Sequence, residues 1–338
     1  MLKVNKSPVF IVSSGRSGTT LLRSFLNGTE NIYVPHESDF LVRGFPFYSR
    51  KEAYTEDDLW IITHLFIRSS QDEGWGMDCN YIYNYLRENR PSTFAQINNS
   101  IYYSYLDQIG KSDIPWGVKA PVLIAHLDRI FSIFPNAKII HIVRDGRDVC
   151  LSYQDIHKKI TKRKRFGPNT ILANALYWID GLRRIEKSNN NQVYELRYED
   201  LIMKTDETLK NIFTFLNFSY SPAAASGMKR EKSVLEEHRL GIHKNISKPL
   251  LKSNILKYKV SMPSWKRFFY ELIACPYLQK YSYEIEYEIT KNTLFNIIRV
   301  PLYIIANKFN SFRYNRRDIK FYQEAKQRAA LSSVSRGE

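Results

Sequence analysis

The sequence predicts an α/β fold with three layers, in which helices cover both faces of a central, mainly parallel sheet. Short apolar runs rich in β-branched residues, typical of buried strands, occur at residues 8–14, 138–143 and 193–197. Between them lie longer segments whose apolar residues recur every three or four positions, as in amphipathic helices. Polar loops follow the first two strands directly, and α/β proteins bind ligands at that edge of the sheet.

The composition is that of an ordinary globular protein. The chain has 338 residues, of which 43% are hydrophobic and 25% charged, enough for a sizeable core. The formal net charge of +16 favours anionic partners such as nucleotides, acidic glycans, nucleic acids or acidic lipids. The cysteines Cys79, Cys150 and Cys275 are odd in number and lack CxxC spacing, which argues against a disulfide framework or a zinc site. We therefore expect free thiols in a reducing compartment.

Two segments decide the expected location and domain organisation. Residues 1–6 are polar and basic without the apolar stretch of a signal peptide, and no apolar run reaches the ~18 residues of a spanning helix. We expect a cytoplasmic protein with one main domain over residues 1–290, including a long basic loop at 221–262. Residues 291–338 are predicted to be a basic amphipathic extension. It should pack on the domain as an ordinary helix, and peripheral contact with a membrane is the alternative.

The other elements follow in order along the chain. Residues 31–35 predict a second strand, and a capping pattern at Thr55 predicts the start of a helix. Residues 72–90 are rich in tyrosine and ambiguous. The remaining predictions are a helix from Pro91 to Leu106, a short strand at 116–119, a helix opened by Pro121, a basic surface run at 158–165, and helices at 170–186 and 205–216.

The loop after the first strand has the composition of an anion-binding site. It has the sequence Gly-Arg-Ser-Gly-Thr-Thr and leads directly into a helix. Glycines allow positive φ and close approach of the backbone, hydroxyls are donors, and a helix N-terminus favours negative charge. The expected ligands are Gly15, Arg16, Ser17, Gly18, Thr19 and Thr20.

This loop lacks the Gly-Lys-Ser/Thr ending with which P-loops hold Mg²⁺ and terminal phosphates. Arg16 supplies the positive charge instead. A nucleotide kinase or hydrolase of the P-loop class is therefore disfavoured, and no metal ion is expected. A nucleic-acid-binding module is suggested only by the net charge, because the sequence has no recognised nucleic-acid motif.

A second anion site is predicted where the strand at 138–143 ends. Arg144 can form a bidentate pair with a phosphate, and Ser152 follows after about two helical turns. Arg147 and Asp148 are interpreted as structural, in the first turn of the helix or in an ion pair. Two anion sites at the ends of parallel strands suit a nucleotide with anionic groups at two positions of its ribose.

These motifs resemble those of the sulfotransferases that use 3′-phosphoadenosine 5′-phosphosulfate (PAPS). Residues 14–22 are similar to the family's 5′-phosphosulfate loop, residues 142–152 to its 3′-phosphate site, and residues 196–201 to an Arg-Tyr-Glu-Asp-Leu segment of many members. The resemblance covers roughly residues 8–270. It implies a P-loop-like sulfotransferase fold, with PAPS as cosubstrate and 3′-phosphoadenosine 5′-phosphate (PAP) as product.

Three residues are expected to carry the transfer chemistry. Arg16, where many cytosolic members have Lys, is more similar to the protein-tyrosine and carbohydrate enzymes and would stabilise developing charge. Lys119 is similar to a lysine that many members place beside the phosphosulfate. Glu37 lies at a point similar to that of the general base of protein-tyrosine sulfotransferases. His36 is the rival base, and because adjacent residues of an extended segment point in opposite directions, only one should face the site.

Three further residues are candidate nucleotide ligands. Tyr198 either contacts the adenosine or packs beneath the sheet. Trp265 and Lys266 resemble the late Trp-basic segment that closes over PAPS in many members, although the Arg-Lys-Gly form of the small-molecule enzymes is absent. His141, within a strand, is interpreted as a hydrogen-bonded core histidine.

The resemblance thus predicts an enzyme that moves a sulfuryl group in line from PAPS to an acceptor hydroxyl, with Glu37 as base. The basic surface favours a carbohydrate or glycolipid acceptor. A protein tyrosine is the alternative.

Overall fold

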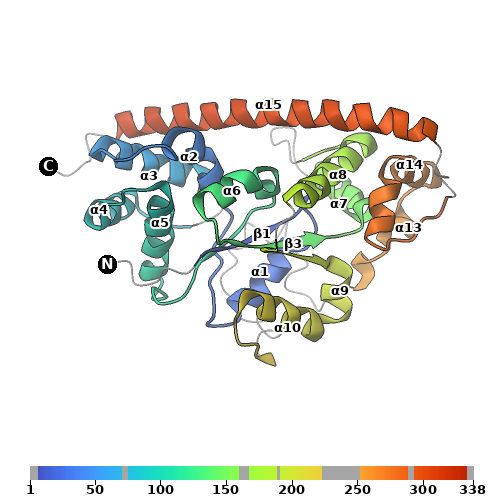
Figure 1. Ribbon diagram of the computed structural model, residues 1–338, viewed down its shortest axis with the longest axis horizontal. Helices are drawn as coiled ribbons and strands as arrows, with labels where there is room; N and C mark the ends of the chain where they lie inside the picture. Colours follow the sequence, from blue (N-terminus) through green and yellow to red (C-terminus); the bar gives the residue numbers. More distant parts are fainter. Residues whose placement is uncertain are drawn as a thin grey trace.

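The structure is a computed structural model, and it describes residues 7–70, 75–159, 167–188, 191–222, 252–287 and 293–332. Its centre is a sheet of four parallel strands in the order β2-β1-β3-β4. The strands are β1 (Val9–Val12), β2 (Gly117–Lys119), β3 (Lys138–Val143) and β4 (Val193–Arg197). With helices on both faces, this sheet confirms the predicted α/β fold (Figure 1).

Strand β1 lies inside the sheet, in parallel register with β2 on one side and β3 on the other. Val9 and Ile11 belong to one hydrophobic core, and Phe10 and Val12 belong to another. A parallel strand that is covered on both faces needs apolar residues at every position. This explains why its sequence is an unbroken apolar run.

Helices form the two outer layers (Figure 1). One face of the sheet is covered by α1 (Thr19–Asn27), α9 (Tyr198–Met203) and α10 (Thr205–Leu216). The other face is covered by α6 (Leu127–Ile133), α7 (Gly146–Lys159) and α8 (Ile171–Ser188). Further helices in the described residues are α2 (Phe40–Tyr48), α3 (Glu56–Ser70), α4 (Cys79–Asn89), α5 (Phe94–Gln108), α13 (Lys257–Ser261) and α14 (Ser264–Lys280), with the 3-10 helices η2 (Pro121–His126) and η5 (Lys252–Asn254) and the C-terminal α15 described below.

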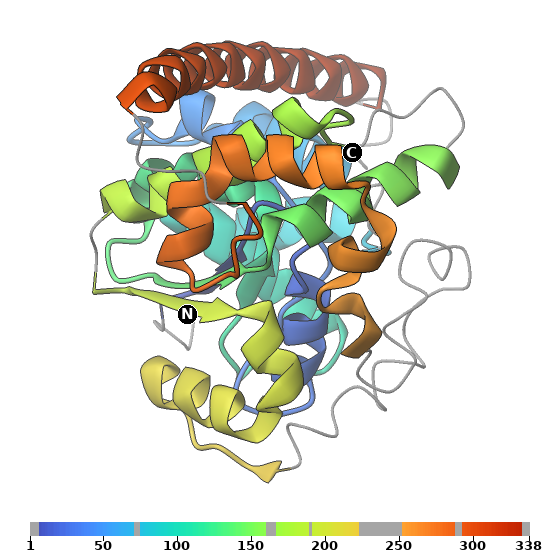
Figure 2. The same cartoon turned by 90° about the vertical axis from the view of Figure 1, so that its right-hand side faces the viewer.

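The strand order creates a switch point between β1 and β3. The chain leaves β1 towards β2 on one side of the sheet and leaves β3 towards β4 on the other, so the loops after β1 and β3 diverge. Open α/β sheets bind ligands in the crevice at such a point. In Figure 2 the arrow of β4 points towards the side on which dark-blue α1 and the light-orange segment before α14 lie. Both predicted anion-binding loops are therefore at this edge.

The second strand predicted at residues 31–35 is wrong. In the described structure the segment makes one isolated parallel bridge, between Tyr33 and Trp116. The side chain of Asn27 binds both backbone groups of Val34, accepting from its N–H at 2.7 Å and donating to its carbonyl at 2.9 Å. These two hydrogen bonds from the side chain of Asn27 hold residues 31–35 in place of the strand pairing that was expected.

Two helices begin later than the prolines that predicted them. The helix expected from Pro91 begins at Phe94, because Thr93 forms a capping box there. The segment opened by Pro121 starts as the 3-10 helix η2 and becomes α-helical at Leu127. Helices α2 and α4 were not predicted, and α2 contains a proline that masks its helical pattern.

The C-terminal residues form one long helix, α15 (Thr293–Leu331), which runs across the top of Figure 1 over α2, α3 and α8. Its own residues Ala325 and Ala329 are buried, and its Tyr322 stacks on Phe47 of α2 with ring centroids 4.0 Å apart. No helix in the described ranges is long and apolar enough to cross a membrane.

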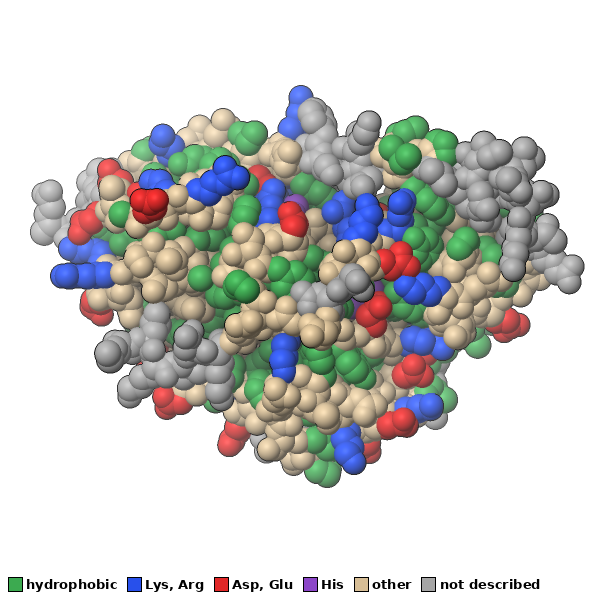
Figure 3. All heavy atoms as spheres, in the orientation of Figure 1, with side chains coloured by type: hydrophobic (Ala, Val, Ile, Leu, Met, Phe, Trp, Pro, Cys, Tyr) green, Lys and Arg blue, Asp and Glu red, His purple; other side chains and the backbone are tan. Residues whose placement is uncertain are grey.

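Two predicted loops lie largely outside the described residues: residues 160–165 of the basic run expected at 158–165, and residues 223–251 of the loop expected at 221–262. The end of that second loop is not a loop, because it contains η5 and α13. On the face shown in Figure 3, Lys and Arg side chains are interspersed with acidic ones. The described side chains of that face therefore do not form the segregated basic patch expected of a nucleic-acid-binding surface.

Candidate active site

The loop after β1 has the backbone of an anion-binding nest. Gly15, Arg16 and Gly18 have positive φ, at 81°, 54° and 95°. Ser17 Oγ donates a hydrogen bond to the carbonyl of Gly15 at 3.0 Å and fixes the turn. Helix α1 begins at Thr19 with glycine at its N-cap, so no side chain caps its first turn. The N–H groups of this turn, together with the helix dipole, suit a bound anion.

Two tyrosines leave room only for glycine in the loop. A Cβ atom on Gly15 would lie 2.1 Å from Tyr153 Oη, and one on Gly18 would lie 2.5 Å from Tyr198 Cδ2. The Tyr153 hydroxyl also donates to the carbonyl of Ser14 at 3.2 Å. The ring of Tyr198, for which the sequence left two roles open, therefore packs against the loop.

Arg16 connects the two predicted anion sites. Its Nε donates to Ser152 Oγ on α7 at 3.1 Å, and its carbonyl accepts from Nη1 of Arg144 at 3.1 Å. Burial lowers the pKa of Arg16, and its charged or titratable neighbours are Tyr153, Arg144 and Glu37. Because burial penalises a charged group, two neighbouring cations gain from an anion placed between them.

Arg144 stands at the end of β3 with one donor unused. It is 8% exposed, and Nη2 donates to the carbonyl of Asn254 at 2.7 Å. Its guanidinium lies over the ring of Tyr198, 4.8 Å from the centroid. Its buried Nε has no hydrogen-bond partner among the described residues. Since buried polar groups are nearly always satisfied, this atom fits a phosphate oxygen of a bound nucleotide.

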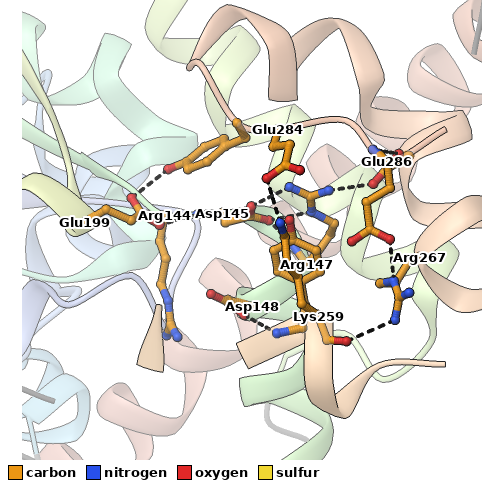
Figure 4. Close-up of polar contacts among 12 residues, drawn as sticks. Arg144, Asp145, Arg147, Asp148, Glu199, Lys259, Arg267, Glu284 and Glu286 are labelled. Atoms are coloured by element: carbon orange, nitrogen blue, oxygen red, sulfur yellow. Dashed lines mark hydrogen bonds and ion pairs between the residues drawn. The ribbon is translucent and has the colours of Figure 1, made fainter. Parts of the chain in front are cut away.

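A buried ion-pair network fixes the turn between β3 and α7 (Figure 4). Arg147 is fully buried and donates to both carboxylate oxygens of Asp145, at 3.0 and 2.7 Å, and to Glu271 of α14 at 2.5 Å. Asp148 accepts from the backbone N–H of Tyr258 at 2.8 Å. The structural interpretation of Arg147 and Asp148 agrees with these contacts.

Two buried carboxylates beside Arg144 have raised pKa values. Burial raises the pKa of Asp148 to about 6, although the charge of Arg144 opposes the shift. Burial also raises the pKa of Glu199, which accepts hydrogen bonds from the N–H of Asp145 at 3.1 Å and the hydroxyl of Tyr283 at 3.0 Å. For both carboxyl groups, the effect of burial on the pKa outweighs that of the hydrogen bonds they accept, which favour the charged form.

Glu37 and Lys119 meet at the first anion site. Lys119 ends β2, is 2% exposed, and donates from Nζ to Glu37 Oε1. The carbonyl of Glu37 accepts from Trp75 Nε1 at 3.3 Å. The charge of Glu37 also acts to raise the pKa of Arg16. The structure therefore brings the predicted base, the predicted lysine and the loop arginine together.

His36 has different partners from Glu37. Its Nδ1 lies 3.4 Å from Arg23 Nη1 on α1, and Arg23 also donates to the carbonyl of Pro35 at 3.4 Å. One side chain of the adjacent pair thus meets Lys119 and the other meets α1, as expected for an extended segment.

Trp265 and Lys266 lie in the first turn of α14. Trp265 is 58% exposed, and among the described residues its ring contacts are with Phe269 and with Lys266, whose Nζ is 5.4 Å from the ring centroid. Both ring contacts are with residues of α14 itself. Tyr198 packs against the glycine-rich loop, but no such contact connects Trp265 or Lys266 to that loop. His141 hydrogen-bonds Glu195 at 2.9 Å and is buried, which confirms it as a core histidine.

Two residues at the candidate site, Tyr153 and Asn254, were not predicted from the sequence. Tyr153 lies against Gly15 and also against Gly167, where a Cβ atom would come within 2.3 Å of its ring. Its one signal in the sequence is its place directly after Ser152. Asn254 acts through its backbone carbonyl, which no sequence pattern reveals.

No metal site is visible in the described ranges, since no group of three or more His, Cys, Asp or Glu side chains is placed to hold an ion. The cysteines are free thiols: Cys150 and Cys275 are buried and Cys79 is half-buried. Burial raises the pKa of Cys150 to about 12, so that thiol stays protonated near neutral pH.

Known proteins match both the sequence and the fold. Residues 8–222, more than half of the chain, match the model described as the sulfotransferase family. The fold is similar to a sulfotransferase domain from the curacin biosynthetic pathway, with 20% identity and a TM-score of 0.53 over 82% of this chain and 98% of that domain. A sulfotransferase domain of the Synechococcus PCC 7002 olefin synthase has 20% identity and a TM-score of 0.52 over 84% and 98%.

Two relatives are similar over parts of their length. An uncharacterized protein of Aquifex aeolicus is 24% identical over 280 residues, which are 78% of this chain and 31% of that protein. A putative protein-tyrosine sulfotransferase of Caenorhabditis briggsae is 31% identical over 109 residues, 30% of this chain and 37% of that protein. The chain thus spans about a third of each relative.

The substitution Gly18→Ala should weaken binding of PAP, the nucleotide that the sequence predicts. The new Cβ would strain a backbone at φ 95° and collide with Tyr198. Strain of about 1–3 kcal/mol corresponds to roughly a tenfold to hundredfold loss of affinity, measurable by titration calorimetry. Gly110→Ala is the matched control, because its φ is also positive but nothing lies within 4 Å. Wild-type affinity in Gly18→Ala would contradict the role of the loop.

The substitution Arg147→Met should lower the free energy of unfolding by about 3–5 kcal/mol, because it leaves buried carboxylates without a counter-ion. Those carboxylates belong to Asp145 and Glu271. Denaturant titration measures the loss. Lys280→Met, which removes the half-exposed pair with Glu186, should cost far less. Equal costs would show that the buried network does not stabilise the turn.

Proposed function

The chain belongs to the sulfotransferase family, and on that basis we propose that it transfers a sulfuryl group from PAPS to a hydroxyl of a carbohydrate or glycolipid. The transfer domain is proposed to occupy residues 1–290, with residues 291–338 as its extension. The three free thiols support action in a reducing compartment, the cytoplasm.

One observation carries the proposal: the two anion sites are joined by direct contacts. Arg16 bonds to Ser152 and to Arg144, each at 3.1 Å. PAPS carries its phosphosulfate and its 3′-phosphate on the same ribose. A PAPS site therefore needs two anion-binding sites next to each other. The unused Nε of Arg144 and the hydroxyl of Ser152 support binding of the 3′-phosphate.

The other residues fit the needs of sulfuryl transfer. The acceptor oxygen forms a bond to sulfur while the bond from sulfur to the 5′-phosphate oxygen breaks, and PAP leaves. The N–H groups of the loop and the guanidinium of Arg16 stabilise the charge that develops on that oxygen. Lys119 adds a second positive charge on the side of β2. Glu37 receives the proton of the acceptor hydroxyl.

Glu37 is favoured as base over His36 by its neighbours. It is paired with Lys119 and acts electrostatically on Arg16, whereas His36 lies against Arg23 of α1. An incoming anionic group competes with Glu37 for Lys119, which would release the carboxylate for the acceptor proton. Its side chain is 35% exposed, so an acceptor can reach it.

The proposed carbohydrate or glycolipid acceptor is based on the net charge of the protein. A net charge of +16 favours an acidic carbohydrate or glycolipid. A tyrosyl hydroxyl is the second candidate, supported by the 31% identity over 109 residues to a putative protein-tyrosine sulfotransferase. Labelled PAPS offered with glycan, glycolipid and tyrosine-peptide acceptors separates the two. Transfer to peptides alone would overturn the carbohydrate proposal.

The substitution Glu37→Gln should lower kcat by roughly 10²- to 10⁴-fold, because the amide cannot accept the proton. PAP affinity should fall by no more than about threefold, since Glu37 supplies no donor to the phosphates and the loss of its negative charge favours a bound anion. Radiolabelled sulfate transfer and calorimetry measure the two quantities. His36→Gln is the control and should keep most of its activity. The reverse pattern, with His36→Gln inactive and Glu37→Gln active, would assign the base to His36.

A further inference from the structure

Helix α15 lies beyond the residues that match the family, yet it packs onto the segment that carries the proposed base. It covers α2 and α3 (Figure 1). Its described inward residues recur every three or four positions, as one helix face requires. They are Asp318, Phe321, Tyr322, Ala325 and Ala329.

Four charges join this helix to the start of α2. Arg43 donates through Nε and Nη2 to Asp39 Oδ2, at 2.9 and 2.6 Å, and through Nη1 to Asp318 Oδ1 at 2.7 Å. Arg129 of α6 donates to Asp318 Oδ2 at 2.8 Å. The side chains of Arg43 and Asp318 are 1% and 2% exposed. Two positive and two negative charges therefore balance away from water.

Asp39 connects this cluster to the proposed base. It is the N-cap residue of α2 and follows Glu37 by two positions. Its carboxylate makes no cap hydrogen bond to the helix and instead binds Arg43. The intervening Ser38 is buried, and its Oγ accepts from the N–H of Phe40 at 3.3 Å. Arg43 therefore holds a residue that is only two positions from Glu37 in the chain.

We propose that α15 positions the base segment, and that Asp318 is a positioning residue that acts on Glu37 through Arg43 and Asp39. This inference rests on the proposed function, because it assumes that Glu37 is the base. The C-terminal helix would then contribute to the transfer reaction, in addition to covering α2 and α3.

The balance of charge explains why Asp318 controls the cluster. Burial acts to lower the pKa of Arg43, but Asp39 and Asp318 together hold it above its ordinary value. Without the carboxylate of Asp318, the guanidinium groups of Arg43 and Arg129 would repel each other with no anion between them. Arg43 would then lose one of the two anchors that fix its orientation. Displacement of Asp39 would carry Glu37 with it, and a shift of about 1 Å at a reacting group can cost 10²-fold in rate.

The test compares Asp318→Asn with wild type in the full chain. We expect kcat to fall by about tenfold to hundredfold while PAP affinity stays within about threefold, because the nucleotide site is untouched. Glu324→Gln is the matched control on the same helix. It removes a half-exposed pair with Arg68 and should leave kcat unchanged. Wild-type kcat in Asp318→Asn would overturn the inference.

A double variant separates positioning from general loss of structure. If Asp318 acts through Glu37, adding Asp318→Asn to the Glu37→Gln variant should lower kcat by no more than about threefold. An equal additional loss in that background would show that Asp318 acts elsewhere and would overturn the inference. Absence of sulfate transfer by wild type would instead contradict the proposed function itself.

A milder variant decides the case if Asp318→Asn does not fold. Asp39→Asn alters the same chain of contacts at a residue whose side chain is 17% exposed. It should bind PAP as wild type does, lower kcat by about tenfold and show the same lack of additivity with Glu37→Gln. Wild-type kcat in a folded Asp39→Asn protein would contradict the proposal.

Discussion

The link between the loops that end β1 and β3 is the contact on which the candidate site depends. Arg144 reaches from β3 to the carbonyl of Arg16, and Arg16 reaches back to Ser152 on α7. The parallel pairing of β1 with β3 brings these loops to one edge of the sheet. Trp178 donates to the carbonyl of Arg144 at 3.0 Å and anchors its backbone to α8. This link supports the proposal that the two predicted anion sites bind a single ligand.

Much of this arrangement could be predicted from the sequence because its signals are local. The apolar runs identified β1, β3 and β4, and the glycine-rich loop and Arg144 follow two of those runs directly. That the side chains of Glu37 and His36 have different partners could be predicted, because adjacent residues of an extended segment point in opposite directions. The family's motifs then indicated which nucleotide to expect, and the match over residues 8–222 agrees with them.

The rest could not be predicted because it depends on residues that are distant in the chain. Asn27 bonds to Val34 where a strand was expected, and the pattern of residues 31–35 does not reveal such a side-chain clamp. Arg147 pairs with Glu271, 124 positions away, and Arg43 pairs with Asp318, 275 positions away. Each pair looks like ordinary surface charge until the fold buries it. The contact between α15 and α2 could not be predicted for the same reason, because it also joins residues that are distant in the chain.

The comparison that tests the account most directly is the affinity for PAP against that for AMP, which lacks the 3′-phosphate. If one nucleotide occupies both anion sites, PAP should bind at least about a hundredfold tighter than AMP, since charge-assisted bidentate contacts are worth roughly 1.5–3 kcal/mol each. The substitution Arg144→Ala should remove most of that difference, because it removes the guanidinium proposed to bind the 3′-phosphate. Equal affinities of the wild-type protein for PAP and AMP would contradict the account.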